Sequence, residues 1–554
     1  MRNGSEAPNG AGVSGFSGCT VKGKVVEIMV PRTPVLPSDV LRRQGVPVIA
    51  GACQWVRAPL ALALLLAVPP VLALDGEVRM HDPSTVVRAD GKFYVYSTGN
   101  GLPGFVSDDG WTWRRAGQVM EAVPGGRPGP EVIAKGGNNT WAPDIVRSGD
   151  RYFLYYSAPG TQPKSAIGLL VGKTLDPAST DYKWEDAGPV VWSDGVEDCN
   201  AIDPGVFRDP TNGSLWLTYG SYFGYIRLVQ LDPRTGKRLH PDRKPFNVAI
   251  NSEASIMIFR DGWYYLLVTH GSCCAGTSSS YNIRMGRSRK VAGPFLDNMG
   301  IDMLQGGGKL FAASSGRNVG PGHFGLLELE GDVEKFSLHY EADLDRGGVS
   351  VLDIRPLLWR DGWPVAGENL IAGIYQIESA RTGTVLEMAV PGVPVGGPRP
   401  RGPGGPGGAN APPPPPIALQ EPSHVAGDWP SGAAGVRMGP HMLQAQQKWT
   451  IAQAPKAGGY AGSPYFTVRV AGTDRVLAAT ADAEVTVLPA FTGAPEQLWR
   501  IDQLADGTYR LMPKAVPGRT DADLWSLSAV GSSMPTLARF NGAGDRERWT
   551  LKAP

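Results

Sequence analysis

The chain has 554 residues, of which 42% are apolar, and this is enough for two or more domains with separate hydrophobic cores. Its formal net charge of +1 gives no support for a polyelectrolyte partner, so the charge balance argues against nucleic-acid binding. The 73 glycines and 49 prolines, together with the lack of long amphipathic patterns, favour short strands joined by turns. The composition therefore predicts an all-β protein.

A long apolar run lies near the N-terminus and extends from Ala58 to Ala73. Arg57 precedes this run, prolines interrupt it and small residues end it, which is the pattern of a secretory signal; it is too short to span a bilayer comfortably. We interpret residues 1–73 as a disordered leader plus this signal, with the start codon assigned too early. A signal anchor is the alternative. We expect a secreted, extracellular protein that begins near Leu74 and has no membrane partner after signal removal.

From about Val78 to Trp363 one local pattern recurs, in which a turn signal precedes a strand rich in aromatic residues. An Asp-Gly or Asn-Gly turn before alternating aromatic residues is a strong hairpin signal. Five copies at intervals of roughly 50 to 70 residues predict a five-bladed β-propeller over residues 74–366, with an irregular β-sandwich as the alternative. The copies are Asp90–Tyr96, Gly149–Tyr156, Asn212–Tyr219, Asp261–Leu267 and a weaker one, Glu334–Tyr340.

A different repeat occupies residues 371–554. Trp449, Trp499 and Trp549 follow one another at intervals of 50 residues, and each closes a unit that an aromatic-x-aliphatic strand opens. The first unit is longer than the others because it contains a Pro/Gly-rich tract at about 391–417, which we interpret as an insertion within the repeat. Because hairpin packing in such a repeat encloses a common core, we expect all three tryptophans to be buried.

The three units end in Gln447-Lys448-Trp449, Gln497-Leu498-Trp499 and Glu547-Arg548-Trp549. Repeats that end in Gln-x-Trp resemble the ricin-type β-trefoil, although Glu547 departs from that pattern. The resemblance implies a β-trefoil carbohydrate-binding domain after the propeller. It places no sugar pocket, since the Gln-x-Trp residues support the core and the turns in that family.

Three acidic residues stand at or just before predicted strands in different copies of the first repeat. They are Asp82 in His81-Asp82-Pro83-Ser84, Asp203 in Asn200-Ala201-Ile202-Asp203-Pro204, and Glu253 in Asn251-Ser252-Glu253-Ala254-Ser255. A radial repeat would bring them to one place. There, one ionised carboxylate could activate water and one carboxylic acid could protonate a leaving oxygen, while a third raises the pKa of that acid. This is the equipment of an inverting glycosidase, whose two working carboxyls stand about 6.5–9.5 Å apart.

Ten short stretches, spread in order over residues 78–363, resemble glycoside hydrolase family 43 and, within it, the arabinanases. The stretches are His81-Asp82-Pro83-Ser84, Trp141-Ala142-Pro143-Asp144, Ser165-Ala166-Ile167-Gly168, Asn200-Ala201-Ile202-Asp203-Pro204, Ser252-Glu253-Ala254-Ser255, Cys273-Cys274, Tyr281-x-Ile283 with Gly286-Arg287-Ser288, Gly306-Gly307-Gly308, Val319-Gly320-Pro321-Gly322-His323 and Ile354-Arg355-Pro356-Leu357. The resemblance implies a five-bladed propeller and hydrolysis with inversion. It also implies that Asp82 is the general base, that Glu253 is the general acid, and that Asp203 raises the pKa of Glu253 and orients it.

The same resemblance suggests residues that bind the substrate and an ion. Trp141 is a candidate platform on which a sugar ring stacks, with core packing as the alternative. His323 is a candidate ligand, largely through water, of one calcium or sodium ion in the channel, with a hydrogen-bonded core histidine as the alternative. No organic cofactor is expected. The remaining candidate substrate-binding residues flank the acids and are His81, Asn200, Ile202 and Ser252.

Asp144 and the cysteines are further features of the predicted propeller. Asp144 is expected to be a structural hydrogen-bonding residue instead of a fourth catalytic acid. For Cys273 and Cys274 three states stay open: a vicinal disulfide, two thiols, or a bond from Cys199 to one of them.

The function that these features favour is that of a secreted endo-acting α-1,5-L-arabinanase, expected to be a monomer. Its partner would be arabinan or another arabinose-containing plant cell-wall polysaccharide, to which the trefoil tethers the enzyme. The alternatives within the family are an exo-α-L-arabinofuranosidase and a β-xylosidase. The alternative from another class is a non-catalytic, lectin-like carbohydrate-binding protein, which the presence of all three acids disfavours.

Overall fold

The computed structural model describes residues 74–554, apart from 330–331, 391–428, 455, 521–524, 532 and 543. The predicted leader and signal, and the Pro/Gly-rich insertion at about 391–417, lie outside the described residues. Within the described residues, no helix is long and apolar enough to cross a membrane. The helices are short: α1 (Pro130–Lys135) and the 3₁₀ turns η1 (Val119–Ala122), η2 (Gly276–Ser278), η3 (Met303–Gln305), η4 (Leu344–Arg346), η6 (Ala445–Gln447) and η7 (Pro495–Gln497).

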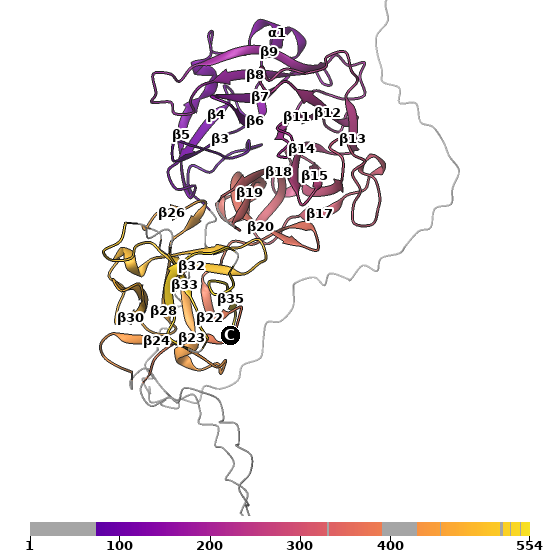
Figure 1. Ribbon diagram of the computed structural model, residues 1–554. Coiled ribbons are helices and arrows are strands. Elements are labelled where there is room, and N and C mark those ends of the chain that lie inside the picture. The colour runs from indigo at the N-terminus through magenta and orange to yellow at the C-terminus, as the bar shows by residue number, and fades with distance from the viewer. Residues whose placement is uncertain are drawn as a thin grey trace, which may run out of the picture. The chain divides into compact units, whose positions relative to one another are not determined.

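The first part of the chain is a five-bladed β-propeller, in agreement with the prediction. Figure 1 shows its five sheets around a common centre. Blade 1 contains β1 (Asp75–Gly76), β2 (Val87–Ala89), β3 (Lys92–Tyr96), β4 (Pro103–Ser107) and β5 (Thr112–Gln118); blade 2 contains β6 (Trp141–Ser148), β7 (Arg151–Pro159), β8 (Ser165–Gly172) and β9 (Trp184–Ser193); blade 3 contains β10 (Gly205–Arg208), β11 (Leu215–Tyr219), β12 (Tyr225–Leu231) and β13 (Phe246–Ile250); blade 4 contains β14 (Glu253–Arg260), β15 (Trp263–His270), β16 (Asn282–Ser288) and β17 (Lys309–Ala312); blade 5 contains β18 (Asn318–Glu328), β19 (Glu334–Asp343), β20 (Val349–Arg360) and β21 (Trp363–Ala366).

The aromatic copies that predicted the propeller coincide with one strand in each blade, namely β3, β7, β11, β15 and β19. Each pairs antiparallel with the strand before it. Two of the turns have both central residues in the left-handed region, with φ of 50° and 77° at Asp90-Gly91 and of 51° and 76° at Asp261-Gly262. This backbone is that of a tight hairpin turn, which explains why Asp-Gly is a reliable signal here.

The ring closes through the segment that precedes blade 1. The backbone N–H of Leu352 in β20 donates to the carbonyl of Val78 at 2.9 Å. The hydroxyl of Ser350 donates to the carbonyl of Met80 at 2.8 Å. The N-terminal segment is therefore fastened to blade 5, and His81 and Asp82 follow directly after this closure.

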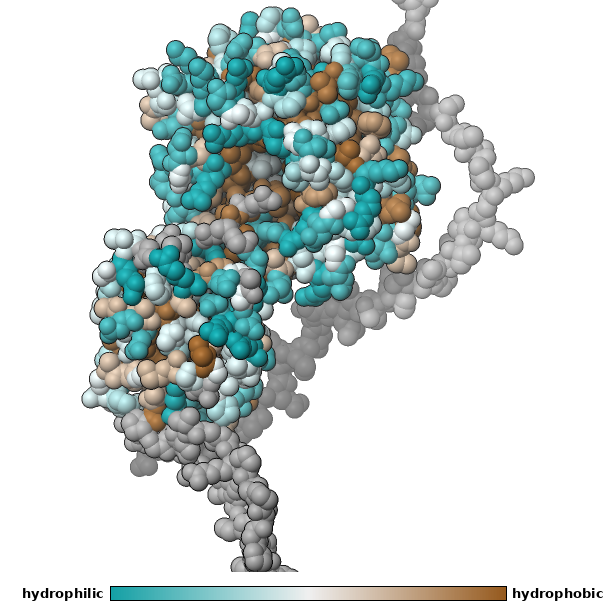
Figure 2. Space-filling model, in the orientation of Figure 1, coloured by the Kyte–Doolittle hydropathy of each residue, from teal (hydrophilic) through white to brown (hydrophobic). Residues whose placement is uncertain are grey.

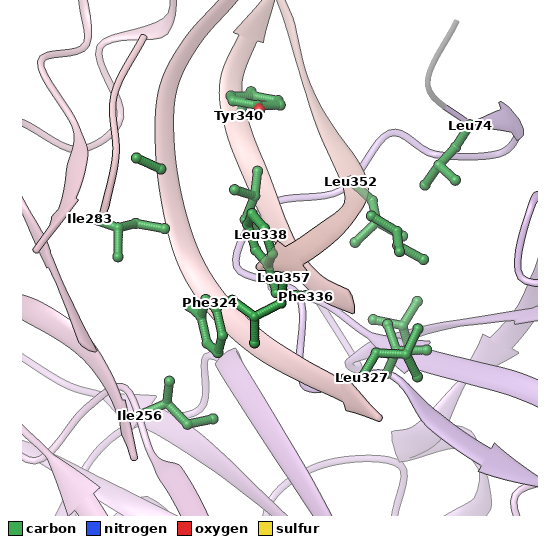
Figure 3. Close-up of a cluster of buried hydrophobic side chains, with 14 of the residues drawn as sticks. Leu74, Ile256, Ile283, Phe324, Leu327, Phe336, Leu338, Tyr340, Leu352 and Leu357 are labelled. Carbon is green, nitrogen blue, oxygen red and sulfur yellow. The ribbon is translucent and has the colours of Figure 1, made fainter. Parts of the chain in front are cut away.

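A continuous apolar cluster joins blades 4 and 5 to the start of the propeller (Figure 3). The rings of Phe324 and Phe336 stack at 5.4 Å between centroids, and Phe311 packs edge-on against both. Burial of these large side chains stabilises the contact between blades 4 and 5, and the same cluster continues to Val78 and Leu352, where the ring closes. Figure 2 shows that one face of the propeller is hollowed at its centre, with hydrophobic residues in the hollow and mainly hydrophilic residues around it.

The second part of the chain is a β-trefoil. Six of its strands form a closed barrel in the pairing order β22-β25-β28-β31-β32-β35, and β35 returns to β22. Three further hairpins, β23–β24, β29–β30 and β33–β34, occur once in each repeat, although β24 also pairs with β30. The strands are β22 (Gly373–Ser379), β23 (Val385–Met388), β24 (Ala434–Gly439), β25 (Trp449–Gln453), β26 (Gly459–Tyr460), β27 (Ser463–Pro464), β28 (Phe466–Val470), β29 (Val476–Ala479), β30 (Val485–Leu488), β31 (Trp499–Gln503), β32 (Tyr509–Pro513), β33 (Trp525–Ser528), β34 (Thr536–Arg539) and β35 (Trp549–Lys552).

The three repeat tryptophans are core residues, as predicted. Trp449, Trp499 and Trp549 each have a relative exposure of 0%. Their indole N–H groups donate to the carbonyls of Leu386, Leu477 and Leu527 at 2.8, 2.9 and 2.9 Å respectively. Each tryptophan therefore both fills the core and satisfies a buried carbonyl of its own repeat.

We expect Trp499→Ala to lower the free energy of unfolding of the trefoil by about 3–5 kcal/mol, because it leaves a cavity and an unpaired carbonyl. Urea denaturation of the whole chain measures this, and Trp449→Ala should displace the same transition. Met442→Ala is the control, since Met442 is 57% exposed and should leave the midpoint unchanged. An unchanged midpoint for Trp499→Ala would refute its role in the core.

Candidate active site

The three predicted acids come from three different blades and meet at the propeller channel. Asp82 precedes β2 of blade 1, Asp203 precedes β10 of blade 3, and Glu253 is the first residue of β14 in blade 4. His323 lies in β18 of blade 5 and contacts Asp82, with 3.1 Å between His323 Nδ1 and Asp82 Oδ1. Trp141 begins β6 of blade 2. All five blades therefore contribute a residue that the sequence had singled out.

The backbone explains how these side chains leave the strands. Asp82, Ala142, Asp203, Ala254 and His323 occupy corresponding places in the five blades, and their φ values lie between 38° and 57°. In blades 2, 4 and 5 the strand register shifts at this place, as in a β-bulge. A bulge with a left-handed residue redirects the side chain, and such non-glycine residues cluster at functional sites.

Asp82 is held as an ionised carboxylate. Its Oδ2 accepts a hydrogen bond from Thr98 Oγ1 at 2.8 Å and lies 2.8 Å from His81 Nδ1. Burial opposes ionisation, but the charges of His81 and His323 outweigh it and hold the pKa of Asp82 well below its usual range. Asp82 is therefore ionised at neutral pH, which its predicted role as general base requires.

Asp203 and Glu253 form a pair of carboxyl groups whose pKa values are raised, in contrast to the lowered pKa of Asp82. Burial and the facing charge of Glu253 raise the pKa of Asp203 to about 8. Burial and the charge of Asp82 also raise the pKa of Glu253, against a hydrogen bond that the hydroxyl of Tyr281 donates to it. Two carboxyls that repel each other out of water retain a proton at neutral pH, and this pair can therefore deliver one.

The pair also has an internal order. Asp203 is almost fully buried, and its Oδ2 accepts a hydrogen bond at 3.2 Å from the backbone N–H of Ala254, the residue after Glu253. Its own backbone N–H donates to Ser157 Oγ at 2.8 Å. Glu253 is partly exposed. Asp203 is therefore the more buried carboxyl of the pair, and Glu253 is the more accessible one.

Residues 70–364, more than half of the chain, match the family described as glycosyl hydrolases family 43, and residues 445–533 match the ricin-type beta-trefoil lectin domain-like family. The chain belongs to glycosyl hydrolases family 43. It is therefore a glycoside hydrolase by family, with a ricin-type trefoil after its family 43 propeller.

Several named relatives resemble this family 43 propeller. The chain is 34% identical over 330 residues to the extracellular exo-α-(1→5)-L-arabinofuranosidase ArbA of Cellvibrio japonicus. This match covers 56% of this chain and 92% of that protein. It is 31% identical over 296 residues to the extracellular endo-α-(1→5)-L-arabinanase 1 of Bacillus subtilis, with coverages of 51% and 87%. The structure of Cellvibrio cellulosa α-L-arabinanase with arabinohexaose matches with a TM-score of 0.48 and 31% identity, covering 52% of this chain and 95% of that one.

The predicted substrate-binding residues differ in accessibility. Trp141 is 38% exposed, so its ring is available at the family 43 site. Asn200 is fully buried, and its amide lies between Gln162, to which it donates at 2.9 Å, and Ser221, from which it accepts at 2.6 Å. Ile202 and Ser252 are also buried. Contact between these three buried residues and a sugar stays a prediction.

Asp144 has the structural role that its position suggested. Its two carboxylate oxygens accept hydrogen bonds from the backbone N–H groups of Thr85 at 2.9 Å and Val206 at 2.8 Å. Thr85 follows the Asp82 segment and Val206 follows Asp203, so this one side chain ties blade 2 to blades 1 and 3. Burial raises the pKa of Asp144, while these backbone donors oppose the shift.

The cysteines adopt the first of the three states considered. Cys273 and Cys274 form a vicinal disulfide, and among the described residues Cys199 is a buried free thiol. Burial raises the pKa of Cys199 to about 12, so it is not a nucleophile at neutral pH.

His323 has one carboxylate beside it, that of Asp82, but belongs to no larger group of potential metal ligands in the described part of the chain. No cluster of three potential protein ligands there includes it, and its Nδ1 faces Asp82. Two other clusters occur nearby, but His81 in them pairs with Asp82 and Glu341, and the two cysteine sulfurs are bonded together. A calcium or sodium ion at His323 would need water for its remaining ligands, and it stays a prediction.

Two residues with contacts in the site had no role assigned from the sequence. Tyr281 donates to Glu253, and Glu341 contacts His81 from β19. Tyr281 stood in one of the stretches that resemble family 43, but its spacing alone gave no reason to pair it with an acid. Glu341 is one of several charged or polar residues in β19, so the sequence offered no signal that singles it out.

We expect Tyr281→Phe to move the alkaline limb of the kcat/KM profile upward by about one pH unit. The hydrogen bond from Tyr281 favours the ionised form of Glu253, so its loss raises the pKa of this acid and keeps it protonated to higher pH. Initial rates from pH 4 to 10 measure the shift.

Tyr264→Phe is the matched control for this experiment. Tyr264 is also buried and donates to a carboxylate, Asp209, which is outside the site. Its removal should leave both limbs of the profile in place. A downward or absent shift in Tyr281→Phe would contradict the assignment of Glu253 as the group that titrates on the alkaline side.

Proposed function

We propose that the chain is a secreted hydrolase that cleaves the α-1,5-L-arabinofuranosidic bonds of arabinan with inversion of configuration. The observation that carries this proposal is the ionised Asp82 beside a carboxyl pair, Asp203 and Glu253, that retains a proton. The names of the relatives support the choice of substrate, since they are arabinanases and an arabinofuranosidase. Both of the first two relatives are also described as extracellular.

In the proposed reaction each carboxyl has one task. Asp82 removes a proton from a water molecule as its oxygen attacks the anomeric carbon. The bond from that carbon to the glycosidic oxygen breaks, and Glu253 gives its proton to the leaving oxygen. Asp203 keeps the pKa of Glu253 high and fixes the backbone beside it through the N–H of Ala254. Trp141 supplies an exposed ring on which a sugar can stack, and an ion near His323 would act without bonding to the substrate.

Two modes of attack each have support. Endo cleavage is the mode named for most of the relatives, among them the arabinanase 1 of B. subtilis and the probable arabinan endo-1,5-α-L-arabinosidase D of Emericella nidulans. Exo cleavage is the second candidate because ArbA of C. japonicus, at 34% identity, is named an exo-arabinofuranosidase. We propose the endo mode and a monomeric enzyme.

We expect wild-type protein to release mixed arabino-oligosaccharides from debranched linear arabinan in the first minutes. Chromatography over time measures the products, and proton NMR of the first-formed anomer measures inversion. Arabinose alone from the start would replace the endo mode by the exo mode.

Asp82→Asn and Glu253→Gln should each lower kcat by about 10²–10⁴-fold, because each removes an acid–base catalyst.

The lectin-like alternative is tested by the same variants. A non-catalytic protein would bind arabinan and release no sugar, whether or not the acids are present. Full turnover by Glu253→Gln would overturn the proposed roles. If wild-type protein cleaves no arabinan, xylans and other arabinosides are the next substrates to examine.

We propose that the trefoil tethers the enzyme to plant cell-wall polysaccharide. A chain shortened to residues 74–366 should then keep its kcat/KM on soluble debranched arabinan and hydrolyse insoluble cell-wall arabinan several-fold more slowly, since it loses the gain in effective concentration. Pull-down of inactive Glu253→Gln with insoluble polysaccharide measures the binding directly. Equal rates on insoluble material for the long and short chains would contradict the tethering role.

A further inference from the structure

The geometry points to Glu341 as a positioning residue that holds the general base Asp82 in place through the imidazole of His81. This inference rests on the proposed role of Asp82. Glu341 belongs to β19 of blade 5 and His81 to the segment before blade 1, so the interaction joins residues 260 positions apart. No function above depends on Glu341.

The imidazole of His81 lies between two carboxylates. Its Nε2 is 3.0 Å from Glu341 Oε1, and its Nδ1 is 2.8 Å from Asp82 Oδ2. An ionised carboxylate accepts hydrogen bonds and cannot donate them. Both ring nitrogens must therefore carry a hydrogen, and His81 is an imidazolium whose ring plane is fixed at both ends.

The surroundings leave His81 as the cationic partner of Glu341. The side chain of Glu341 is only 2% exposed, so its charge requires a partner inside the protein. His339 lies 3.6 Å from the same carboxylate, but its burial lowers its pKa to about 4, and it is neutral under ordinary conditions. The centroids of the His339 and His81 rings are 4.5 Å apart, so His339 limits the movement of His81 on that side. The remaining neighbours, Cys273 and Cys274, form an uncharged disulfide.

The protonation states are compatible with this arrangement over the whole working range of a glycosidase. Burial opposes the charge of His81, but the carboxylates of Asp82 and Glu341 outweigh it and raise the pKa of His81 to about 10. Burial opposes the charge of Glu341 too, but the neighbouring imidazoles of His339 and His81 lower its pKa to about 2. The ion pair is complete between these two values and is lost only outside them.

The consequence concerns the two oxygens of Asp82. His81 and Thr98 both hold Oδ2 at 2.8 Å, whereas Oδ1 lies 3.1 Å from His323 Nδ1 and 4.0 Å from His339 Nδ1. The clamp therefore fixes one oxygen and leaves Oδ1 as the oxygen that takes the proton from water. Without Glu341, His81 can turn about its side chain and lose its second hydrogen, and the base then loses its fixed orientation.

The test is Glu341→Gln in the full chain, which keeps the shape of the side chain and removes its charge. We expect kcat on arabinan to fall by about ten-fold with KM changed less than two-fold, since the base is displaced but not removed. Imidazole ¹⁵N shifts of histidine-labelled protein, with His81→Gln to assign the signal, should show that the titration of His81 moves from about 10 toward its ordinary value of about 6.5. Glu341→Asp, which keeps the charge, should retain part of the wild-type kcat and part of the raised pKa of His81.

Asp343→Asn is the matched control. Asp343 is a buried carboxylate two residues further along the same strand, where it pairs with Arg346 instead of His81. This variant should leave kcat and the His81 titration unchanged. Wild-type kcat in Glu341→Gln, or an unmoved His81 titration in that folded variant, would overturn the inference. Because the NMR titration needs no substrate, it still judges the clamp if arabinan proves not to be cleaved and the proposed function fails.

Discussion

The active site depends on one backbone constraint, a left-handed residue at the same place in every blade. Asp82, Ala142, Asp203, Ala254 and His323 all have positive φ, although none is glycine. Such a conformation costs about 1–2 kcal/mol for a residue with a side chain. It persists because packed strands on both sides determine it, and it turns successive side chains out of the strand and into the channel. The burial of large apolar side chains between blades thus holds a geometry that a single strand would not adopt.

Identical chemical groups acquire different roles in this channel because of their neighbours. Asp82 is bordered by His81 and His323, so its charged form is favoured. Asp203 and Glu253 face each other with little solvent, so their charged forms are disfavoured. The fold therefore separates the pKa values of groups that are all carboxyls, as the proposed base and acid require if one site is to carry out both proton transfers at one pH.

The sequence predicts the parts of this structure that local rules control. The aromatic strands and their Asp-Gly turns are local, and the three acids stand in stretches specific enough to resemble family 43. The contacts of Tyr281 and Glu341 could not be predicted in the same way. The first depends on how the residue before β16 lies against the start of β14, and the second depends on ring closure between segments 260 residues apart. Asn200 shows that the reverse error also occurs. Its closeness to Asp203 in the sequence suggested a sugar-binding role, but its buried amide hydrogen-bonds to Gln162 and Ser221.

Both halves of the chain use repetition of the backbone to place side chains that do not repeat. In the trefoil each repeat tryptophan donates to a leucine carbonyl, but the residue that follows this leucine differs in each repeat. These residues are Glu387, Ala478 and Ser528. Of these, Glu387 is buried and accepts hydrogen bonds from Arg437 and Gln447. In the propeller the repeated place carries Asp, Ala, Asp, Ala and His in turn. A symmetric ring of five aspartates would repel itself and could not separate a base from an acid. Substitution at equivalent places breaks the symmetry of charge while the symmetry of the backbone keeps every group aimed at the same channel.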